Sequence, residues 1–218
     1  MKTLASISAP DAERSVPADR IGPNAAIQLI AALQRRGETV ALTQLFCATG
    51  LEAWLTEPPG EMIAASDAAR LHVGLRQVLP EARAAAVLTE AGRLTGDYLL
   101  AYRIPKLAQG ALKALPARIS AKLLLRAIAA HAWTFAGDGR FEADSAGSAE
   151  IRIFDNPLCA GLIAQAPSCV WHAAVLQRLF GALVSSRCRV EESLCCARGD
   201  RCCRFRLTWI PPNAPPRV

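Results

Sequence analysis

The sequence predicts an α+β fold, in which a helical N-terminal part precedes a four-stranded antiparallel sheet with a packed helix. Apolar residues recur at helical spacing from residue 23 to residue 132, and the period then changes to the alternation of a half-buried strand. The last part reads strand, strand, helix, strand, strand, an order typical of a helix layered on an antiparallel sheet. We expect disordered tails at residues 1–20 and 211–218, a helical region at 21–115 and a second domain at 116–210.

Five helices are predicted before the sheet, and glycine or proline separates most of them. The first ends at Gly37 and the second at Gly50, because glycine takes the left-handed backbone that ends many helices. Pro80 separates the third from the fourth, and the fourth ends before Pro105. The predicted ranges are 25–36, 38–49, 67–79, 81–102 and 117–132.

Alternating side chains predict the beginning of the sheet. Ile151 and Ile153 alternate with charged residues over 149–155, as in a strand with one face buried. Residues 140–143 pair with this strand across a turn, and a helix at 169–184 with strands at 187–195 and 203–209 completes the layer.

Composition and charge argue against several classes of protein. No stretch of eighteen uncharged apolar residues occurs, so we expect no membrane span, and no nucleic-acid-binding motif is recognisable. Residues 1–20 lack the apolar run of a secretory signal, and we expect a cytoplasmic protein. Because the mean hydropathy is positive, the helices must bury most of their apolar surface or expose it to a partner. An apolar ligand cavity could be lined by part of this surface.

Residues 98–137 contain six basic side chains and no acidic one. This composition is typical of a solvated helix face, and alternatively of a face that binds anionic partners.

Cysteines are concentrated near the C-terminal end. A tight turn around Gly199 predicts a hairpin in which Cys195 faces Cys203 and Cys196 faces Cys202. Two opposed thiolates are half of a tetrahedral zinc site; the alternatives are a disulfide across the hairpin or buried thiols that only pack. The five cysteines within sixteen residues are Cys188, Cys195, Cys196, Cys202 and Cys203.

A zinc site at this hairpin needs two more ligands from elsewhere. Glu191 and Glu192 precede the hairpin, while Cys169 and His172 begin the preceding apolar helix. All four are candidates on residue type alone.

Two sequence patterns carry a resemblance to a known family. One is the hairpin pattern Glu192-x-x-Cys195-x-x-x-Gly199-Asp200-x-x-Cys203-x-Phe205, and the other combines Asn156-Pro-Leu-Cys159 with Cys169-x-Trp-His-Ala-Ala. The first resembles the closing motif of the 4-vinyl reductase domain family, a small-ligand-binding α+β domain. The second resembles, more narrowly, bacteriochlorophyll biosynthesis proteins of phototrophic bacteria.

The resemblance implies a structural zinc ion held by Cys169, Glu192, Cys195 and Cys203. Glu192 and Cys195 point to opposite faces of a regular strand, so this ligand set requires a β-bulge between them. Without a bulge, the alternatives are Glu191 with Cys195 and Cys203, or the competing pair Cys196 and Cys202.

The resemblance also implies a magnesium tetrapyrrole ligand, such as magnesium protoporphyrin monomethyl ester or divinyl protochlorophyllide. Its binding would belong to the 8-vinyl reduction of bacteriochlorophyll biosynthesis or to a neighbouring step. His131 is a candidate axial ligand, and Arg126, with Lys122 or Arg118, is a candidate partner for the carboxyl groups. The ligand-binding candidates are Arg126, His131, Trp133, Trp171 and His172.

Two other functions remain open. One is a zinc-stapled interaction module that assembles biosynthetic enzymes or forms a homodimer. The other is the vinyl reductase itself, but hydride transfer needs a nicotinamide or flavin, and no G-x-G-x-x-G pattern follows a predicted strand. We therefore predict a binding protein and assign no catalytic residue.

Overall fold

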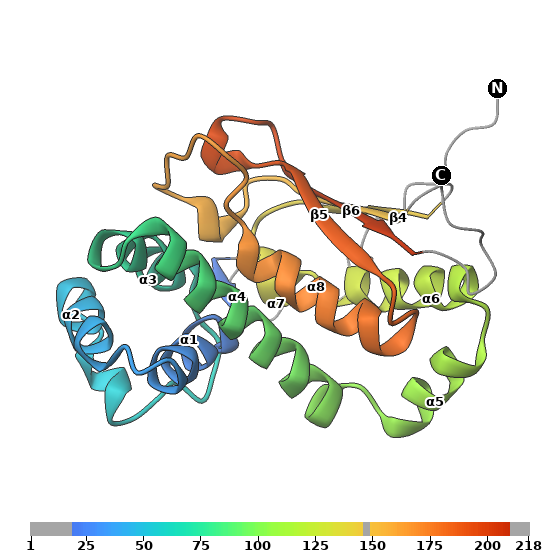
Figure 1. Cartoon of the computed structure of the whole chain (residues 1–218), viewed down its shortest axis with the longest axis horizontal. Helices are drawn as coiled ribbons and strands as arrows, with labels where there is room; N and C mark the ends of the chain where they lie inside the picture. Colours follow the sequence, from blue (N-terminus) through green and yellow to red (C-terminus); the bar gives the residue numbers. More distant parts are fainter. Residues whose placement is uncertain (1–18, 146–148, 210–218) are drawn as a thin grey trace.

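The computed structural model describes residues 19–145 and 149–209 (Figure 1). Its first part is helical: α1 (Asn24–Arg35), α2 (Thr39–Thr49), the 3-10 helix η1 (Glu52–Leu55), α3 (Ala65–Val78) and α4 (Glu81–Tyr98). A two-stranded sheet pairs β1 (Arg20–Ile21) with β2 (Ile63–Ala64). The four helices predicted for this region are confirmed within a few residues of their expected bounds.

The last residue of the predicted N-terminal tail, Arg20, lies in the described part of the chain. Arg20 lies in β1 opposite Ala64, and its guanidinium donates hydrogen bonds to the Met62 carbonyl. Pairing to a distant segment therefore orders Arg20, although its local sequence resembles a tail. Residues 1–18 and the predicted tail at 211–218 lie outside the described residues.

Helices continue from α4 to the beginning of the large sheet. A π-helical turn, η2 (Leu99–Arg103), extends α4 and is followed by α5 (Lys106–Ala114), α6 (Ala117–Ala130) and the short α7 (Trp133–Ala136). The predicted range of 81–102 for α4 ran into this π-helical turn, and α5 was not predicted.

The second part is the predicted antiparallel sheet with its helix. The strands β3 (Phe141–Asp144), β4 (Ala149–Ile153), β5 (Arg189–Leu194) and β6 (Cys203–Thr208) lie in the order β3-β4-β6-β5, with every neighbouring pair antiparallel. Helix α8 (Val170–Leu183) packs on one face of this sheet (Figure 1). The predicted fold class is confirmed.

The two faces of the sheet differ as the alternation predicted. Ile151, Phe205 and Leu207 are buried in one apolar cluster with Phe180 of α8. The opposite face carries charged side chains, among them Arg152, which forms salt bridges with Glu142 and Glu150. One buried and one solvated face is the usual arrangement of an antiparallel sheet.

Two apolar clusters meet along α4 and α8. One extends from Ile21 to Leu94 and includes Trp171 of α8, whereas the other extends from Leu100 to Leu207. Close packing of the two helices uses glycines: a Cβ on Gly92 would lie 2.8 Å from Ala174 Cβ, and one on Gly96 would lie 2.7 Å from Arg178 Cβ. A domain boundary near residue 115 stays a prediction.

Among the described residues, no helix combines the length and the apolar character that crossing a bilayer requires.

We predict that Gly92→Ala destabilises the protein, because the added methyl group would collide with Ala174 and with the carbonyl oxygen of Trp171. Overpacking of this kind lowers the free energy of unfolding by about 1–3 kcal/mol, measurable by urea denaturation. Gly181→Ala in α8 is the control, since its Cβ would meet only Gln177 Nε2, at 3.8 Å. The control should be neutral or stabilising by up to about 1 kcal/mol. Equal unfolding midpoints for the two variants would contradict the close contact of α4 with α8.

Candidate metal centre and ligand-binding residues

Four buried cysteines converge at one end of the sheet. Cys159 ends the 3-10 helix η3 (Pro157–Cys159), and Cys169 directly precedes α8. Cys195 follows β5, and Cys203 begins β6 after the 3-10 helix η4 (Cys196–Arg198). Their four sulfur atoms lie within 4.8 Å of one another. Three of the four predicted metal ligands are therefore brought together, and Cys159 joins them.

A β-bulge shapes the hairpin that carries Cys195 and Cys203. The register shifts between Glu192, which pairs with Phe205, and Leu194, which pairs with Arg204. The bulge that the predicted ligand set required is therefore present.

The turn of the hairpin is held by glycine and aspartate. Gly199 has a φ of 89°, a left-handed conformation that favours glycine, and the Asp200 carboxylate accepts a hydrogen bond from Cys195 N at 2.9 Å. Both residues belong to the pattern that resembles the 4-vinyl reductase family.

Asn156 fixes the cluster from the loop before η3. Its Oδ1 accepts a hydrogen bond from Leu158 N, while its Nδ2 donates to the sulfurs of Cys169 and Cys203, both at 3.4 Å. The side chain thus links the loop carrying Cys159 to two of the other thiols. Asn156 and Cys159 also line a shallow surface depression together with Gly199 and Asp200 of the hairpin turn.

The sulfur–sulfur distances are too long for disulfide bonds and shorter than, or close to, those in a zinc site. Cys169 Sγ lies 3.0 Å from Cys159 Sγ, 3.2 Å from Cys203 Sγ and 3.7 Å from Cys195 Sγ. Zinc–thiolate bonds of roughly 2.3 Å place the sulfurs of a tetrahedral site about 3.8 Å apart. A disulfide bond is much shorter, at about 2.05 Å, and all eight cysteines are free. The donor set therefore fits a soft divalent cation such as zinc.

Thiol pKa values reflect the crowding of the four sulfurs. Hydrogen bonds from the thiols of Cys159, Cys169 and Cys203 lower the pKa of Cys195 far below its usual range. The hydrogen bond to Cys159 raises the pKa of Cys169, and the same neighbour raises that of Cys203. Hydrogen bonds from neighbouring thiols thus stabilise a single thiolate, whereas a divalent cation would stabilise several of them together.

Glu192 lies beside the cluster. Its Oε2 accepts a hydrogen bond from Cys169 N at 2.7 Å, whereas Oε1 is buried without a partner among the described residues. Burial, together with the negative charge of Cys195, raises the pKa of Glu192 to about 8. Glu192 as a ligand stays a prediction. The signal for Cys159 was present in the Asn156-Pro-Leu-Cys159 pattern, but Cys159 was not predicted as a ligand.

The alternative ligand sets are not assembled. Glu191 is exposed and pairs with Arg206, and Cys196 lies in η4, where its sulfur donates to the Ile153 carbonyl at 3.9 Å. Neither Cys196 nor Cys202 belongs to the four-sulfur group.

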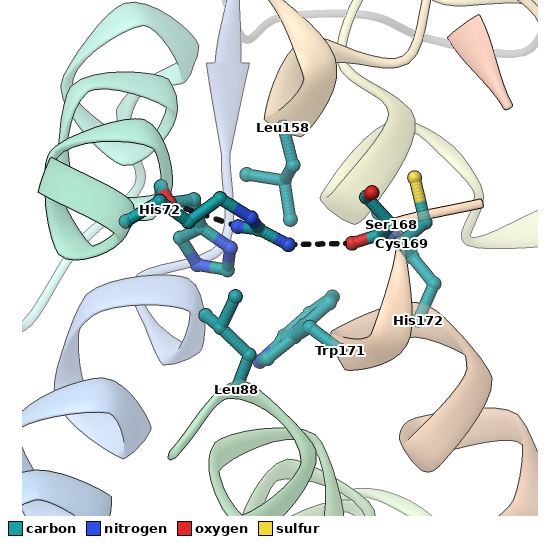
Figure 2. A pocket seen from close by; sticks show the side chains of 8 residues that line it. His72, Leu88, Leu158, Ser168, Cys169, Trp171 and His172 are labelled. Carbon is teal, nitrogen blue, oxygen red and sulfur yellow. Dashed lines mark hydrogen bonds between the residues drawn. The ribbon is translucent and has the colours of Figure 1, made fainter. Parts of the chain in front are cut away.

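Trp171 and His172, two of the predicted ligand-binding residues, lie in the core. Their rings contact edge to face at 4.9 Å, and the nitrogens of both side chains have no hydrogen-bond partner among the described residues. Burial lowers the pKa of His172 to about 3 and that of His72 to about 4. The cavity beside them, lined also by Leu88 and Leu158, measures about 10 Å³ and accommodates a single water molecule (Figure 2).

The other three candidates lie on the surface at the end of α6 and the beginning of α7. Arg126 and His131 are exposed, and the Trp133 residue is 38% exposed. His131 Nδ1 lies 2.9 Å from the carbonyl oxygen of Ala127, so this nitrogen carries the proton. In the neutral imidazole, the other ring nitrogen, Nε2, then has a lone pair that can bind a metal ion. The five predicted residues therefore form two separate sets.

Comparison with known proteins identifies the part of the chain that holds most of the sheet. The model of the 4-vinyl reductase domain matches residues 149–208, which extend from β4 to the end of β6. The structure is also similar to the phenol-responsive sensory domain of the transcription activator PoxR with phenol, at a TM-score of 0.49 and 18% identity. That match covers 66% of this chain and 74% of the sensory domain.

Two curated relatives are similar over most of the chain. The bacteriochlorophyll synthase 23 kDa chain of Cereibacter sphaeroides is 44% identical over 190 residues, 87% of this chain and 91% of the relative. The protein of the same name from Rhodobacter capsulatus is 42% identical over 188 residues, 86% of each chain. At this identity and coverage, the chain belongs to the family of the bacteriochlorophyll synthase 23 kDa chain, and it carries a 4-vinyl reductase domain, as the sequence resemblance predicted.

Proposed function

We propose that this protein binds a magnesium tetrapyrrole intermediate of bacteriochlorophyll biosynthesis and presents it to a biosynthetic enzyme. The relatives' name supports the pathway, because both are called a chain of bacteriochlorophyll synthase. The observation that carries the binding proposal is the exposed His131, whose Nδ1 is engaged by Ala127 and whose Nε2 is free among the described residues. An unprotonated imidazole nitrogen is a common metal ligand.

The neighbouring surface supplies the other contacts that such a pigment needs. Trp133 offers an aromatic face on which a flat ring can stack, and Arg126 offers a guanidinium that recognises a carboxylate with two hydrogen bonds. The core pair, Trp171 and His172, would have to move apart before a ring could reach them, because the adjoining cavity measures about 10 Å³. We therefore assign pigment binding to the surface set.

The metal has a structural role in this proposal. Cys159, Cys169, Cys195 and Cys203 would hold a zinc ion, whose positive charge would stabilise their thiolates. Four protein ligands leave no open position for a reacting molecule. The metal-bound cluster would thereby connect the β5–β6 hairpin to the start of α8 and stabilise the predicted ligand-binding domain at residues 116–210.

Assembly of biosynthetic enzymes is the second candidate function. The relatives are named as one chain of a synthase, which suits a protein that works in contact with others. Pigment binding by the purified protein distinguishes the two functions, because an assembly module does not require it.

We predict that the purified protein contains about one zinc ion per chain and that Cys159→Ser loses it. The variant should also lose on the order of 3 kcal/mol or more of folding stability, because metal binding contributes directly to folding. Elemental analysis and denaturant unfolding measure the two effects. Cys47→Ser is the control, since Cys47 is exposed and distant in sequence from the cluster.

Glu192→Gln separates the two ligand sets. If the four sulfurs bind the metal, this variant keeps its zinc, because an amide oxygen can still accept the hydrogen bond from Cys169 N. Loss of zinc in Glu192→Gln with full retention in Cys159→Ser would instead support the ligand set implied by the family resemblance. Absence of metal from the wild-type protein would contradict both.

We predict that magnesium protoporphyrin monomethyl ester shifts its Soret band when titrated with the protein. His131→Ala should abolish the shift, and Arg126→Gln should weaken binding about tenfold, because a charge-assisted hydrogen bond is lost. Arg36→Gln, which removes an exposed arginine from α1's end, is the matched control. Unchanged absorption and fluorescence of the pigment would refute binding. A shift that His131→Ala leaves intact would refute the surface site.

A further inference from the structure

The whole net charge of the chain comes from one segment. Residues 98–137 hold six basic residues and no acidic one, while the other nineteen lysines and arginines are matched by nineteen aspartates and glutamates. All six are exposed, and none forms an ion pair with a described residue. They are Arg103, Lys106, Lys113, Arg118, Lys122 and Arg126. This part of the molecule therefore carries unneutralised positive charge.

The exposed side chains of helix α6 form two parallel stripes, one basic and one apolar. Arg118, Lys122 and Arg126 are spaced four residues apart and form a basic stripe. The residue after each of them is apolar and exposed, which gives a second stripe with the same spacing: Ile119, Leu123 and Ala127. Ile119 is 48% exposed and Leu123 is 41% exposed, so the fold leaves much of their apolar surface in contact with water.

Helix α5 and its flanking turns extend the apolar surface. Leu107 is 89% exposed, Tyr102 is 76% exposed and Leu115 is 38% exposed. Both helices lie at the side of the molecule away from α2 and α3 (Figure 1). We call the exposed residues of η2, α5 and α6 the α5–α6 face.

Polar contacts and the partly buried Leu112 hold α5 against the rest of the molecule. Gln109 is the one fully buried residue of α5, and its amide donates hydrogen bonds to the carbonyl oxygens of Leu100 at 2.6 Å and Ile104 at 2.8 Å. The Ser120 hydroxyl of α6 donates to the Leu112 carbonyl. Leu107 and Leu115 thus contribute little to the core, and their exposed surface is available to an outside partner.

We propose that the α5–α6 face docks the protein on the surface of an anionic lipid bilayer. An apolar stripe beside a basic one, on a helix too short and too polar to span the membrane, is the pattern of a helix that lies in the lipid interface. A bilayer supplies negative headgroups for the basic stripe and apolar depth for the leucines beside it. A second copy of the chain would present the same positive charge and is therefore a poorer partner.

Other exposed apolar side chains do not share this pattern. Val40, in α2, is 70% exposed, and Ile163, in the loop between η3 and α8, is 90% exposed; neither belongs to the α5–α6 face. Single exposed apolar residues are common on soluble surfaces and need no partner. The docking proposal goes beyond pigment binding and does not depend on it.

The test is flotation of the purified full-length protein with vesicles in the absence of pigment. The protein should bind vesicles that contain phosphatidylglycerol, bind pure phosphatidylcholine much more weakly, and dissociate as salt is raised, because counter-ions screen the attraction. The double variant Arg118→Gln/Lys122→Gln should bind on the order of 30-fold more weakly. Arg36→Gln/Arg187→Gln removes the same charge from exposed arginines elsewhere and should retain most of the binding.

The apolar stripe has its own matched pair of variants. Leu107→Ser/Ile119→Ser should reduce binding at least tenfold, by removing apolar area that inserts between headgroups, whereas Val40→Ser/Ile163→Ser should not. Absence of wild-type binding to the anionic vesicles, or equal losses in both members of either pair, would overturn the proposal. A third result would also overturn it: the wild type forms a dimer and does not bind vesicles, and Leu107→Ser/Ile119→Ser abolishes the dimer. The α5–α6 face would then join two copies of the chain.

Discussion

Convergence of four buried sulfurs determines how the second half of the chain is arranged. The cysteines come from three separate places: the loop after β4, the residue before α8 and the two sides of the β5–β6 hairpin. Between Ile153 and Val170 the chain has only a short 3-10 helix, so its path depends on Cys159 and Cys169 at the cluster and on Asn156, whose amide contacts two of the sulfurs. Buried thiolates repel one another unless protons or a cation compensate their charge.

The start of α8 connects this cluster to the rest of the molecule. Trp171 packs in the apolar cluster of α1–α4, whereas its neighbour His172 contacts Phe205 of the sheet, with ring centroids 6.0 Å apart. The same turn of helix therefore belongs to both halves of the fold. Gly92 reinforces the junction, because the absence of a side chain lets α4 approach the backbone of Trp171. A shift of Cys169 would consequently be transmitted to the helical half.

Elements with one buried face were predictable from sequence, and elements without one were not. The four strands and the helices of the apolar clusters were predicted because burial imposes a period of 2 or about 3.6 on their apolar residues. Helix α5 was missed, since it has only nine residues and the one side chain that it buries fully, Gln109, is polar. The bulge after Glu192 was named only as a condition of the ligand set that the resemblance implied, whereas Cys159 was missed because its loop has no period that would indicate its neighbours.

The composition predicted a large amount of apolar side-chain surface, but it did not predict where in the fold that surface lies. An internal ligand cavity and an exposed apolar face both raise mean hydropathy, and only three-dimensional packing distinguishes them. The cavity next to Trp171 measures about 10 Å³, while Leu107 and Tyr102 are largely exposed on the α5–α6 face. An amphipathic pigment and an anionic bilayer both offer apolar area next to negative charge. The chemistry of this face, with arginines and lysines beside leucine and isoleucine, suits ligands of that kind better than the sealed core does.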